Sequence, residues 1–264
     1  MTRQILLLLT AVLLLSCTHL HTEIREANSL QEVVRFVDDS TLLVVDIDNT
    51  LLEPEGSLGS DQWYYFLVRK YIQFDGMEEK AANERAMHVW NQSQWLVRVR
   101  AVEKVTPSII RQLQDRGIRV MGLTARTLDI INKTFAQLES AGIDLNRSPV
   151  PSNTVEFQSD DVARYEKGIL FVGESNDKGK ALVQFLQQSR HLPAKIVFVD
   201  DKLRHVQNVE RALSMVNVRF LGFRYGAADE KVRLFNQDTQ DLALYASGIL
   251  TKAANERIDE AKAK

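Results

Sequence analysis

Short apolar runs alternate with helical patterns along most of this chain. The runs have the length of strands that are covered on both faces: Leu42–Val45, Ile118–Leu123, Ile196–Val199 and Val218–Phe223. Between them, apolar residues recur every three or four positions, as they do from Leu203 to Leu213, which indicates helices with one buried face. The alternation predicts an α/β fold with a doubly wound, mostly parallel, Rossmann-like sheet.

Two more strands are expected where the chain resumes after Pro149 and Pro151. They lie near Val155–Phe157 and Ile169–Val172. The Glu166-Lys167-Gly168 turn indicates that part of this region forms a local hairpin, because glycine adopts the turn conformations that a short connection requires.

A segment rich in aromatic side chains lies between the first two strands. It carries two helical stripes, the first of which stops at Gly76. The stripe residues are Trp63, Phe66, Leu67, Tyr71 and Phe74, followed by Ala82, Ala86, Met87, Val89 and Trp90. We expect a small helical cap over residues 57–100, inserted into a core of residues 30–56 and 101–250 and followed by a polar tail of residues 251–264.

The N-terminus has the pattern of an export signal. Arg3 precedes an apolar stretch, residues 5–15, which is too short to span a bilayer comfortably but has the length of a signal-peptide core. Leu14-Leu15-Ser16-Cys17 resembles a bacterial lipobox, in which Cys17 is lipidated and anchors the chain to the membrane. The alternative is an uncleaved anchor or a simple secretory signal. Either way the domain is expected in the bacterial cell envelope, facing the periplasm.

The segment that follows Cys17 is polar. We expect residues 18–29 to form a tether, in which His19 and His21 are solvated, and Thr18 directly after the lipobox favours the outer membrane over the inner. Cys17 is the only cysteine of the 264 residues, so the chain can form neither an internal disulfide nor a zinc site built from cysteines. A formal net charge of −2 gives no electrostatic reason to expect a nucleic-acid partner.

Candidate chemistry appears at the end of the first strand, in Asp46-Ile47-Asp48-Asn49-Thr50. Ligands of open α/β sheets bind at such strand ends, where Asp46 and Asp48 can converge on one substrate. One carboxylate can attack phosphorus while the other transfers a proton, and a divalent cation is implied because two anions would otherwise repel a phosphate. A calcium loop is excluded, since Leu51 and Ser57 occupy the positions that require Gly and Glu. An ordinary polar turn is the remaining alternative.

Four segments in order resemble the motifs of haloacid dehalogenase (HAD) superfamily phosphatases. They are Val44-Val45-Asp46-Ile47-Asp48-Asn49-Thr50-Leu51, Val120-Met121-Gly122-Leu123-Thr124, Lys178-Gly179-Lys180-Ala181-Leu182 and Ile196-Val197-Phe198-Val199-Asp200-Asp201. The resemblance is carried by all four together and covers the chain from about Leu42 to Asn208.

The resemblance implies a role for each matching residue. Asp46 is the nucleophile and Asp48 the general acid and base, while Thr124 and Lys178 stabilise the phosphoryl group. Asp200 and Asp201 hold Mg²⁺ together with Asp46 and Asp48. Each later motif has an alternative: Thr124 could cap a helix, although Thr127 is better placed to do so; Lys180 could replace Lys178; and Asp201 could be a helix N-cap.

The expected protein is a lipid-anchored, Mg²⁺-dependent phosphomonoester hydrolase that acts through an aspartyl phosphate on a small phosphorylated substrate. Substrate-binding side chains are expected at Thr124, Arg126, Lys178 and Trp63. In HAD proteins a cap at this point selects the substrate, so Tyr64 and Trp95 are further candidates, although packing is the alternative for any single aromatic residue. The alternative function is that of a catalytically idle protein that binds a phosphorylated ligand, or of a structural surface lipoprotein.

Overall fold

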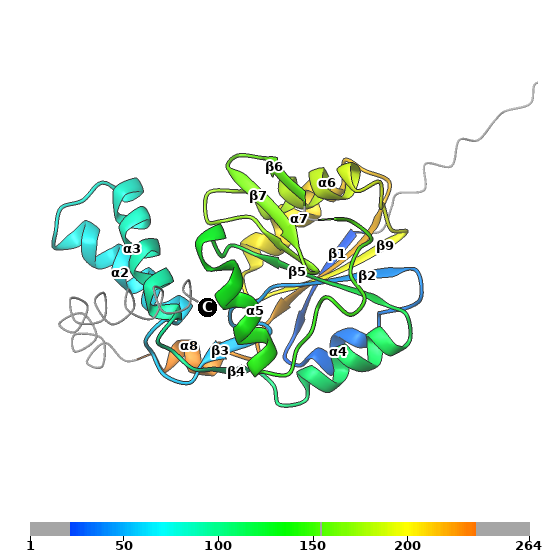
Figure 1. The fold of residues 1–264 in the computed structure, drawn as a ribbon, viewed down its shortest axis with the longest axis horizontal. Coiled ribbons are helices and arrows are strands. Elements are labelled where there is room, and N and C mark those ends of the chain that lie inside the picture. The colour runs from blue at the N-terminus through cyan, green and yellow to red at the C-terminus, as the bar shows by residue number, and fades with distance from the viewer. Residues whose placement is uncertain (1–21, 154, 236–264) are drawn as a thin grey trace, which may run out of the picture.

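The computed structural model describes residues 22–153 and 155–235. Its centre is an eight-stranded sheet with the strand order β1-β10-β9-β2-β5-β8-β7-β6 (Figure 1). In chain order the strands are β1 (Thr22–Ala27), β2 (Thr41–Val45), β5 (Arg119–Thr124), β6 (Val155–Gln158), β7 (Val162–Glu166), β8 (Ile169–Phe171), β9 (Lys195–Asp200) and β10 (Arg219–Tyr225). The pairs from β1 to β8 are parallel and those that join β8, β7 and β6 are antiparallel. The expected mostly parallel α/β sheet is confirmed.

Helices cover both faces of the sheet. One face carries α1 (Leu30–Val34), α4 (Thr106–Asp115) and α5 (Ile131–Ser140), and the other carries α6 (Lys178–Gln188) and α7 (Leu203–Leu213). Strand β2 shows why both faces must be covered. Leu43 and Val45 pack into the first core, whereas Leu42 and Val44 pack into the second, because successive side chains of a strand point to opposite faces. A short helix, α8 (Asp229–Arg233), follows β10.

Two further helices, α2 (Asp61–Gln73) and α3 (Glu79–Gln94), lie beside the sheet, on the left in Figure 1. They leave and re-enter the core through an antiparallel pair of short strands, β3 (Leu52–Pro54) and β4 (Val99–Ala101). The two helices share an apolar cluster of their own, which includes Trp63, Leu67 and Trp90. Its contact with the core includes Ile130 of the short 3-10 helix η1 (Leu128–Ile130). We call α2 and α3 the cap.

Strands β7 and β8 form the hairpin that the Glu166-Lys167-Gly168 turn predicts. The two connecting residues, Lys167 and Gly168, have φ angles of 46° and 80°. Both angles lie in the left-handed region, as a two-residue type I′ turn requires. A Cβ at Gly168 would also lie 2.2 Å from the backbone oxygen of Leu145, so glycine is needed here for space as well as for conformation.

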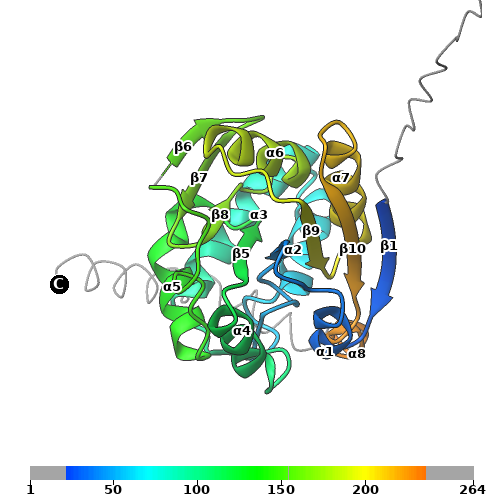
Figure 2. The same ribbon diagram turned by 90° about the vertical axis from the view of Figure 1, so that its right-hand side faces the viewer.

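The prediction of a tether over residues 18–29 is wrong for its second half. Residues 22–27 form β1, which pairs in parallel with β10 along its whole length, at the edge of the sheet (Figure 2). Its side chains are mostly exposed and only Ala27 is buried. An edge strand is held by backbone hydrogen bonds on one side and tolerates polar side chains, so its sequence resembles a linker.

The predicted signal peptide, the lipidation site at Cys17, and His19 and His21 lie outside the described residues, as does the predicted polar tail of residues 251–264. Among residues 22–153 and 155–235, no helix combines the length and apolar character needed to cross a bilayer.

Candidate functional site

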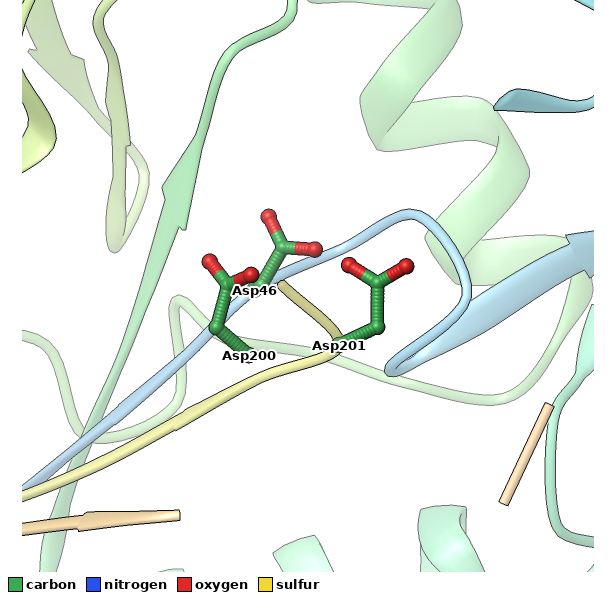
Figure 3. A group of neighbouring side chains, drawn as sticks. All are labelled: Asp46, Asp200 and Asp201. Carbon is green, nitrogen blue, oxygen red and sulfur yellow. The ribbon is translucent and has the colours of Figure 1, made fainter. Parts of the chain in front are cut away.

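Three carboxylates meet where strands β2 and β9 end. Asp46 follows β2, Asp200 is the last residue of β9, and Asp201 comes directly after it. These parallel strands are neighbours, and the N–H of Asp46 donates to the carbonyl of Val199 at 2.9 Å, which extends their pairing to the site itself. One oxygen of each carboxylate lies within 4.8 Å of the other two. Figure 3 shows the three side chains beside one another. Asp46 and Asp200 are buried and Asp201 is partly buried.

Lys178 bridges two of these acids. Its Nζ donates to Oδ1 of Asp46 at 2.6 Å and to Oδ2 of Asp200 at 2.7 Å, and the residue is only 2% exposed. Lys178 is the first residue of α6, whose N-cap is Asp177. The alternative, Lys180, pairs instead with the exposed Asp160 at 3.1 Å. The structure therefore brings Lys178, and not Lys180, to the acids.

Gly179 serves the packing of α6 rather than an approach to phosphate. A Cβ at this position would lie 2.3 Å from the backbone oxygen of Asn208 and 2.8 Å from Cβ of Ala212, both on α7. The absent side chain lets the two helices pack closely at the start of α6, next to Lys178.

Burial and charge compete at the bridged acids. Burial raises the pKa of Asp46 to about 7, although Lys178 acts in the opposite direction. Burial alone would also raise the pKa of Asp200, but the charges of Lys178 and His205 hold it below its usual range. For Lys178, burial would lower the pKa, yet the two carboxylates raise it above the ordinary value. The two carboxylates therefore favour the charged form of Lys178.

Asp201 is not the N-cap of α7. That position is held by Lys202, whose N–H donates to Oδ1 of Asp200 at 2.8 Å. One oxygen of Asp201 accepts from Asn49 at 3.3 Å, and the other is buried without a hydrogen-bond partner among the described residues. Burial raises the pKa of Asp201 well above its usual value. Lys178 bridges two of the three acids and the third has an unpaired oxygen, so the cluster fits a divalent cation.

Asp48 also lines the site and is held by Arg126. Nε and Nη2 of the guanidinium donate to the two carboxylate oxygens at 2.9 and 2.8 Å. Arg126 also contacts Thr124, the threonine of the second motif: the backbone N–H of Arg126 donates to Oγ1 of Thr124 at 3.2 Å. Thr124 is buried, and contact between it and a substrate remains a prediction.

The acids line a small cavity beneath the cap. Besides Asp46, Asp48, Arg126 and Lys178, the cavity is lined by Asp61, Tyr64, Met87, Trp90, Ala125, Glu174, Lys202 and His205. Its volume of about 30 Å³ is room for about two water molecules.

Of the cap aromatic residues that we expected to contact a substrate, Tyr64 lies at the site and Trp63 does not. Trp63 is 0% exposed, packs inside the cap and does not line the cavity, whereas its neighbour Tyr64 and Trp90 do. Trp95 lies elsewhere, with Nζ of Lys133 at 5.9 Å from the centre of its ring. The rotational phase of α2 decides which of two adjacent aromatic residues faces the site.

Sequence reasoning also missed Lys202 and His205. Lys202 pairs with Asp61 at the start of α2 at 2.9 Å, which links the cap to the strand end that carries the acids. Nδ1 of His205 lies 3.1 Å from the carboxylate of Asp200. The sequence contained a signal for both residues, because the first residues of a helix that starts at the fourth motif must lie beside that motif.

A wider groove of about 1060 Å³ runs between α3 and the ends of the core strands, and it shares Tyr64, Met87 and Glu174 with the cavity. Acidic residues dominate the charged part of its lining: Glu78, Glu79, Glu84, Asp129, Asp161 and Glu174, against Lys80 and Arg204. The groove has the position and size to receive the part of a substrate that extends away from the acids.

Several known proteins resemble the chain in sequence. A protein of Chlamydia pneumoniae named "Putative outer membrane protein" is 24% identical over 246 residues, which cover 89% of this chain and 88% of the relative. A protein of the same name from Chlamydia muridarum is 27% identical and covers 70% of this chain and 69% of its own. An uncharacterized protein of Rickettsia prowazekii is 25% identical, with coverage of 80% and 81%.

Solved structures similar to this one include two HAD proteins, members of the superfamily that the four motifs resemble. A HAD family hydrolase from Deinococcus radiodurans, solved with bound phosphate and sodium, has a TM-score of 0.42 at 16% identity and covers 81% of this chain and 99% of its own. The HAD domain of the effector protein Lem4 from Legionella pneumophila has a TM-score of 0.37 at 15% identity, with coverage of 83% and 98%.

One family model matches residues 23–258, which is most of the chain and includes the described strands, the cap and all of the clustered acids. This chain therefore belongs to the family described as "Protein of unknown function (DUF2608)".

Proposed function

We propose that this protein is a phosphomonoester hydrolase that uses Asp46 as its nucleophile and requires a divalent metal ion. The observation that carries the proposal is the buried bridge of Lys178 between Asp46 and Asp200, beside the unpaired oxygen of Asp201. A cation fixed against a carboxylate at the end of a parallel strand is an arrangement that can bind a phosphate and orient an oxygen for attack on it.

The acids are suited to Mg²⁺. Hard divalent cations prefer carboxylate and carbonyl oxygens, and the carboxylates of Asp46, Asp200 and Asp201 lie together. These residues would hold the ion, with the backbone carbonyl of Asp48 as the further ligand that the motif resemblance implies. Bound there, the ion would neutralise charge on the phosphoryl group and on the acids that face it.

The chemistry of the remaining residues follows from their positions. One oxygen of Asp46 accepts from Lys178 at 2.6 Å, while the other has only a 3.4 Å contact with Oγ1 of Thr50 and is the better placed for attack. Attack forms an Asp46–phosphorus bond and breaks the bond from phosphorus to the ester oxygen, which takes a proton from Asp48. Water then gives a proton to Asp48, its oxygen bonds to phosphorus, and inorganic phosphate and the Asp46 carboxylate are released.

The charge of the groove should affect which leaving groups the site accepts. A substrate whose phosphate reaches Asp46 would extend past Tyr64 into a lining in which acids outnumber bases. Like charges repel at this range, so monoesters with a neutral or cationic leaving group should be better substrates than polyanions such as nucleoside triphosphates.

The test is phosphate release by the purified domain from an aryl phosphate and a panel of phosphomonoesters, with Mg²⁺ and with EDTA. The panel should pair phosphoethanolamine with hydroxyethyl phosphate, which differ chiefly in the charge of the leaving group. We expect metal-dependent release that is lost in Asp46→Asn, a nearly isosteric change that should leave the fold intact. Full activity of Asp46→Asn would overturn the nucleophile assignment. Tight binding of a phosphorylated ligand without turnover would instead favour the catalytically idle alternative.

We further propose that the protein resides in the bacterial cell envelope, anchored through a lipid on Cys17. The support is the lipobox-like sequence before Cys17 and the name "Putative outer membrane protein" of the chlamydial relatives. The full chain should incorporate a fatty-acid label and fractionate with membranes, and Cys17→Ser should lose the label. A labelled Cys17→Ser variant would refute the anchor.

A further inference from the structure

Arg126 is almost completely buried, yet it lies at the wall of the candidate active site. It is 3% exposed and donates two parallel hydrogen bonds to the carboxylate of Asp48. A bidentate contact of this kind fixes the orientation of the carboxylate as well as its position. The orientation of Asp48 therefore depends on whatever holds Arg126.

Helix α5 holds the other end of the guanidinium. Nη1 of Arg126 donates to Oγ1 of Thr134 at 3.1 Å and to Oε1 of Gln137 at 2.7 Å. Both side chains are buried, with exposed fractions of 0% and 3%. With the two bonds to Asp48, these contacts use four of the five N–H groups of the guanidinium. Arg126 has little remaining capacity to bind a substrate phosphate.

The same network continues into both ends of the cap. Nε2 of Gln137 donates to Oε1 of Gln94 at 3.2 Å, and Nε2 of Gln94 donates to the carbonyl of Gly59 at 2.8 Å. Gln94 is the last residue of α3, and Gly59 lies just before the N-cap of α2. From α3, the ring of Trp90 also faces the guanidinium, with 5.5 Å from its centre to Cζ of Arg126. A continuous buried path thus joins Asp48 to both connections of the cap.

We propose that Arg126 is a positioning residue that couples the placement of the cap to the orientation of Asp48. The inference rests on the proposed phosphatase function for its kinetic consequences. Its physical basis is that a buried polar network cannot rearrange at one member without leaving another unpaired. The cavity is lined by Asp48 and Arg126 from the core and by Tyr64 and Trp90 from the cap, so a substrate that enters it contacts both parts. Gln94, Gln137 and Arg126 would transmit a displacement of the cap to the proton-transferring carboxylate.

The first experiment measures kcat and KM of Arg126→Ala and Arg126→Lys against an aryl phosphate. We expect kcat to fall about 100-fold with KM almost unchanged, because a misplaced proton donor slows the chemical step more than binding. Millimolar guanidinium should restore part of the kcat of Arg126→Ala. Arg119→Ala is the control, since Arg119 lies at the opposite end of β5 and contacts His191. A raised KM with unchanged kcat would overturn the proposal and make Arg126 a substrate ligand.

Double-mutant cycles test the path itself. If Arg126 acts through Asp48, adding Arg126→Ala to Asp48→Asn should cause no further loss of kcat; additive losses would contradict this. Gln94→Leu should lower kcat in the wild-type background but not in Arg126→Ala. Equal effects of Gln94→Leu in both backgrounds would overturn the coupling to the cap.

A double-mutant cycle followed by fluorescence tests the coupling between Asp48 and the cap without enzyme turnover. The three tryptophans of the chain are at positions 63, 90 and 95, so replacing Trp63 and Trp95 by Phe leaves Trp90 as the reporter beside Arg126. In that background, Asp48→Asn should shift the emission of Trp90 only when Arg126 is present. The same shift in the Arg126→Ala background would refute the coupling. If the wild type hydrolyses no phosphomonoester, the proposed function fails, while this cycle still tests the network.

Discussion

Replacing Lys178 by Met tests the electrostatic core of the site. The substitution keeps a side chain of similar length but removes the ammonium that Asp46 and Asp200 share. The lysine is 2% exposed and Asp200 is 0% exposed, so the carboxylates have little access to water that could replace the lost partner. Removing one member of a buried ion pair costs about 3–5 kcal/mol. In a chain of this size, that corresponds to a fall in Tm of roughly 6–20 °C.

The stability of the variant should also fall more steeply with rising pH than that of the wild type. Without the lysine, burial would raise the pKa of both acids above their values in the unfolded chain. A group whose pKa is higher in the folded state contributes stability at low pH that is lost as the pH rises. The difference in Tm between wild type and Lys178→Met should therefore widen from about pH 5 to pH 8. Mg²⁺ should recover part of it, because a bound cation again neutralises the acids.

The assay is thermal unfolding followed by circular dichroism in EDTA and in Mg²⁺, across this pH range. Lys180→Met is a matched control on the same helix, two residues further along. Its ion pair with Asp160 is exposed to water and should contribute little, so the control should melt close to the wild type. If Lys178→Met melts with the control at every pH, Lys178 does not neutralise the buried acids and the reasoning fails.

Two further predictions concern Gly179 and Asp46. Gly179→Ala should destabilise by about 1–3 kcal/mol, because its Cβ would meet the backbone of Asn208 at 2.3 Å, and this overpacking outweighs the gain of about 1 kcal/mol in helix propensity. Urea unfolding measures this loss of stability. The control is Gly56→Ala, where a Cβ meets nothing within 4 Å, and equal unfolding midpoints of the two variants would contradict the close packing of α6 and α7. Because burial raises the pKa of Asp46 to about 7, its contribution to stability in metal-free protein should decline as the pH rises from about 4 to 7. Tm in EDTA should show a shallower decline for Asp46→Asn, and parallel pH profiles would refute this titration.

The sequence predicted the fold well where the signal was local. The strands that carry Asp46 and Asp200 are continuous apolar runs, and both occur as expected. The hairpin at Lys167-Gly168 was also predicted, because a two-residue turn is specified by the conformations of its own residues. Strand β1 was not predicted, because the signal for it is not local. Its partner, β10, lies almost 200 residues away, and pairing between backbones leaves no mark on the side chains of an edge strand.

The candidate site was predictable only as a set of residues. Chain order and motif spacing singled out Asp46, Asp200 and Lys178, which lie together in the structure. The pattern left open whether Lys180 could replace Lys178 and whether Asp201 was a helix cap. Both questions depend on where α6 and α7 begin relative to the sheet, which packing decides. The choice between Trp63 and Tyr64 likewise depends on the rotation of α2 about its axis.

Local sequence patterns and tertiary packing thus determined different features of this protein. Hydrophobic period and turn chemistry act between near neighbours, so the sequence by itself determined the alternation of strands and helices, the inserted helical segment and the strand end that carries the acids. Tertiary structure alone decided the pairing of Arg126 with Asp48, which are 78 residues apart, and the path from them to the cap. Such contacts depend on how separately folded elements pack against one another, and no local pattern in the chain encodes that geometry.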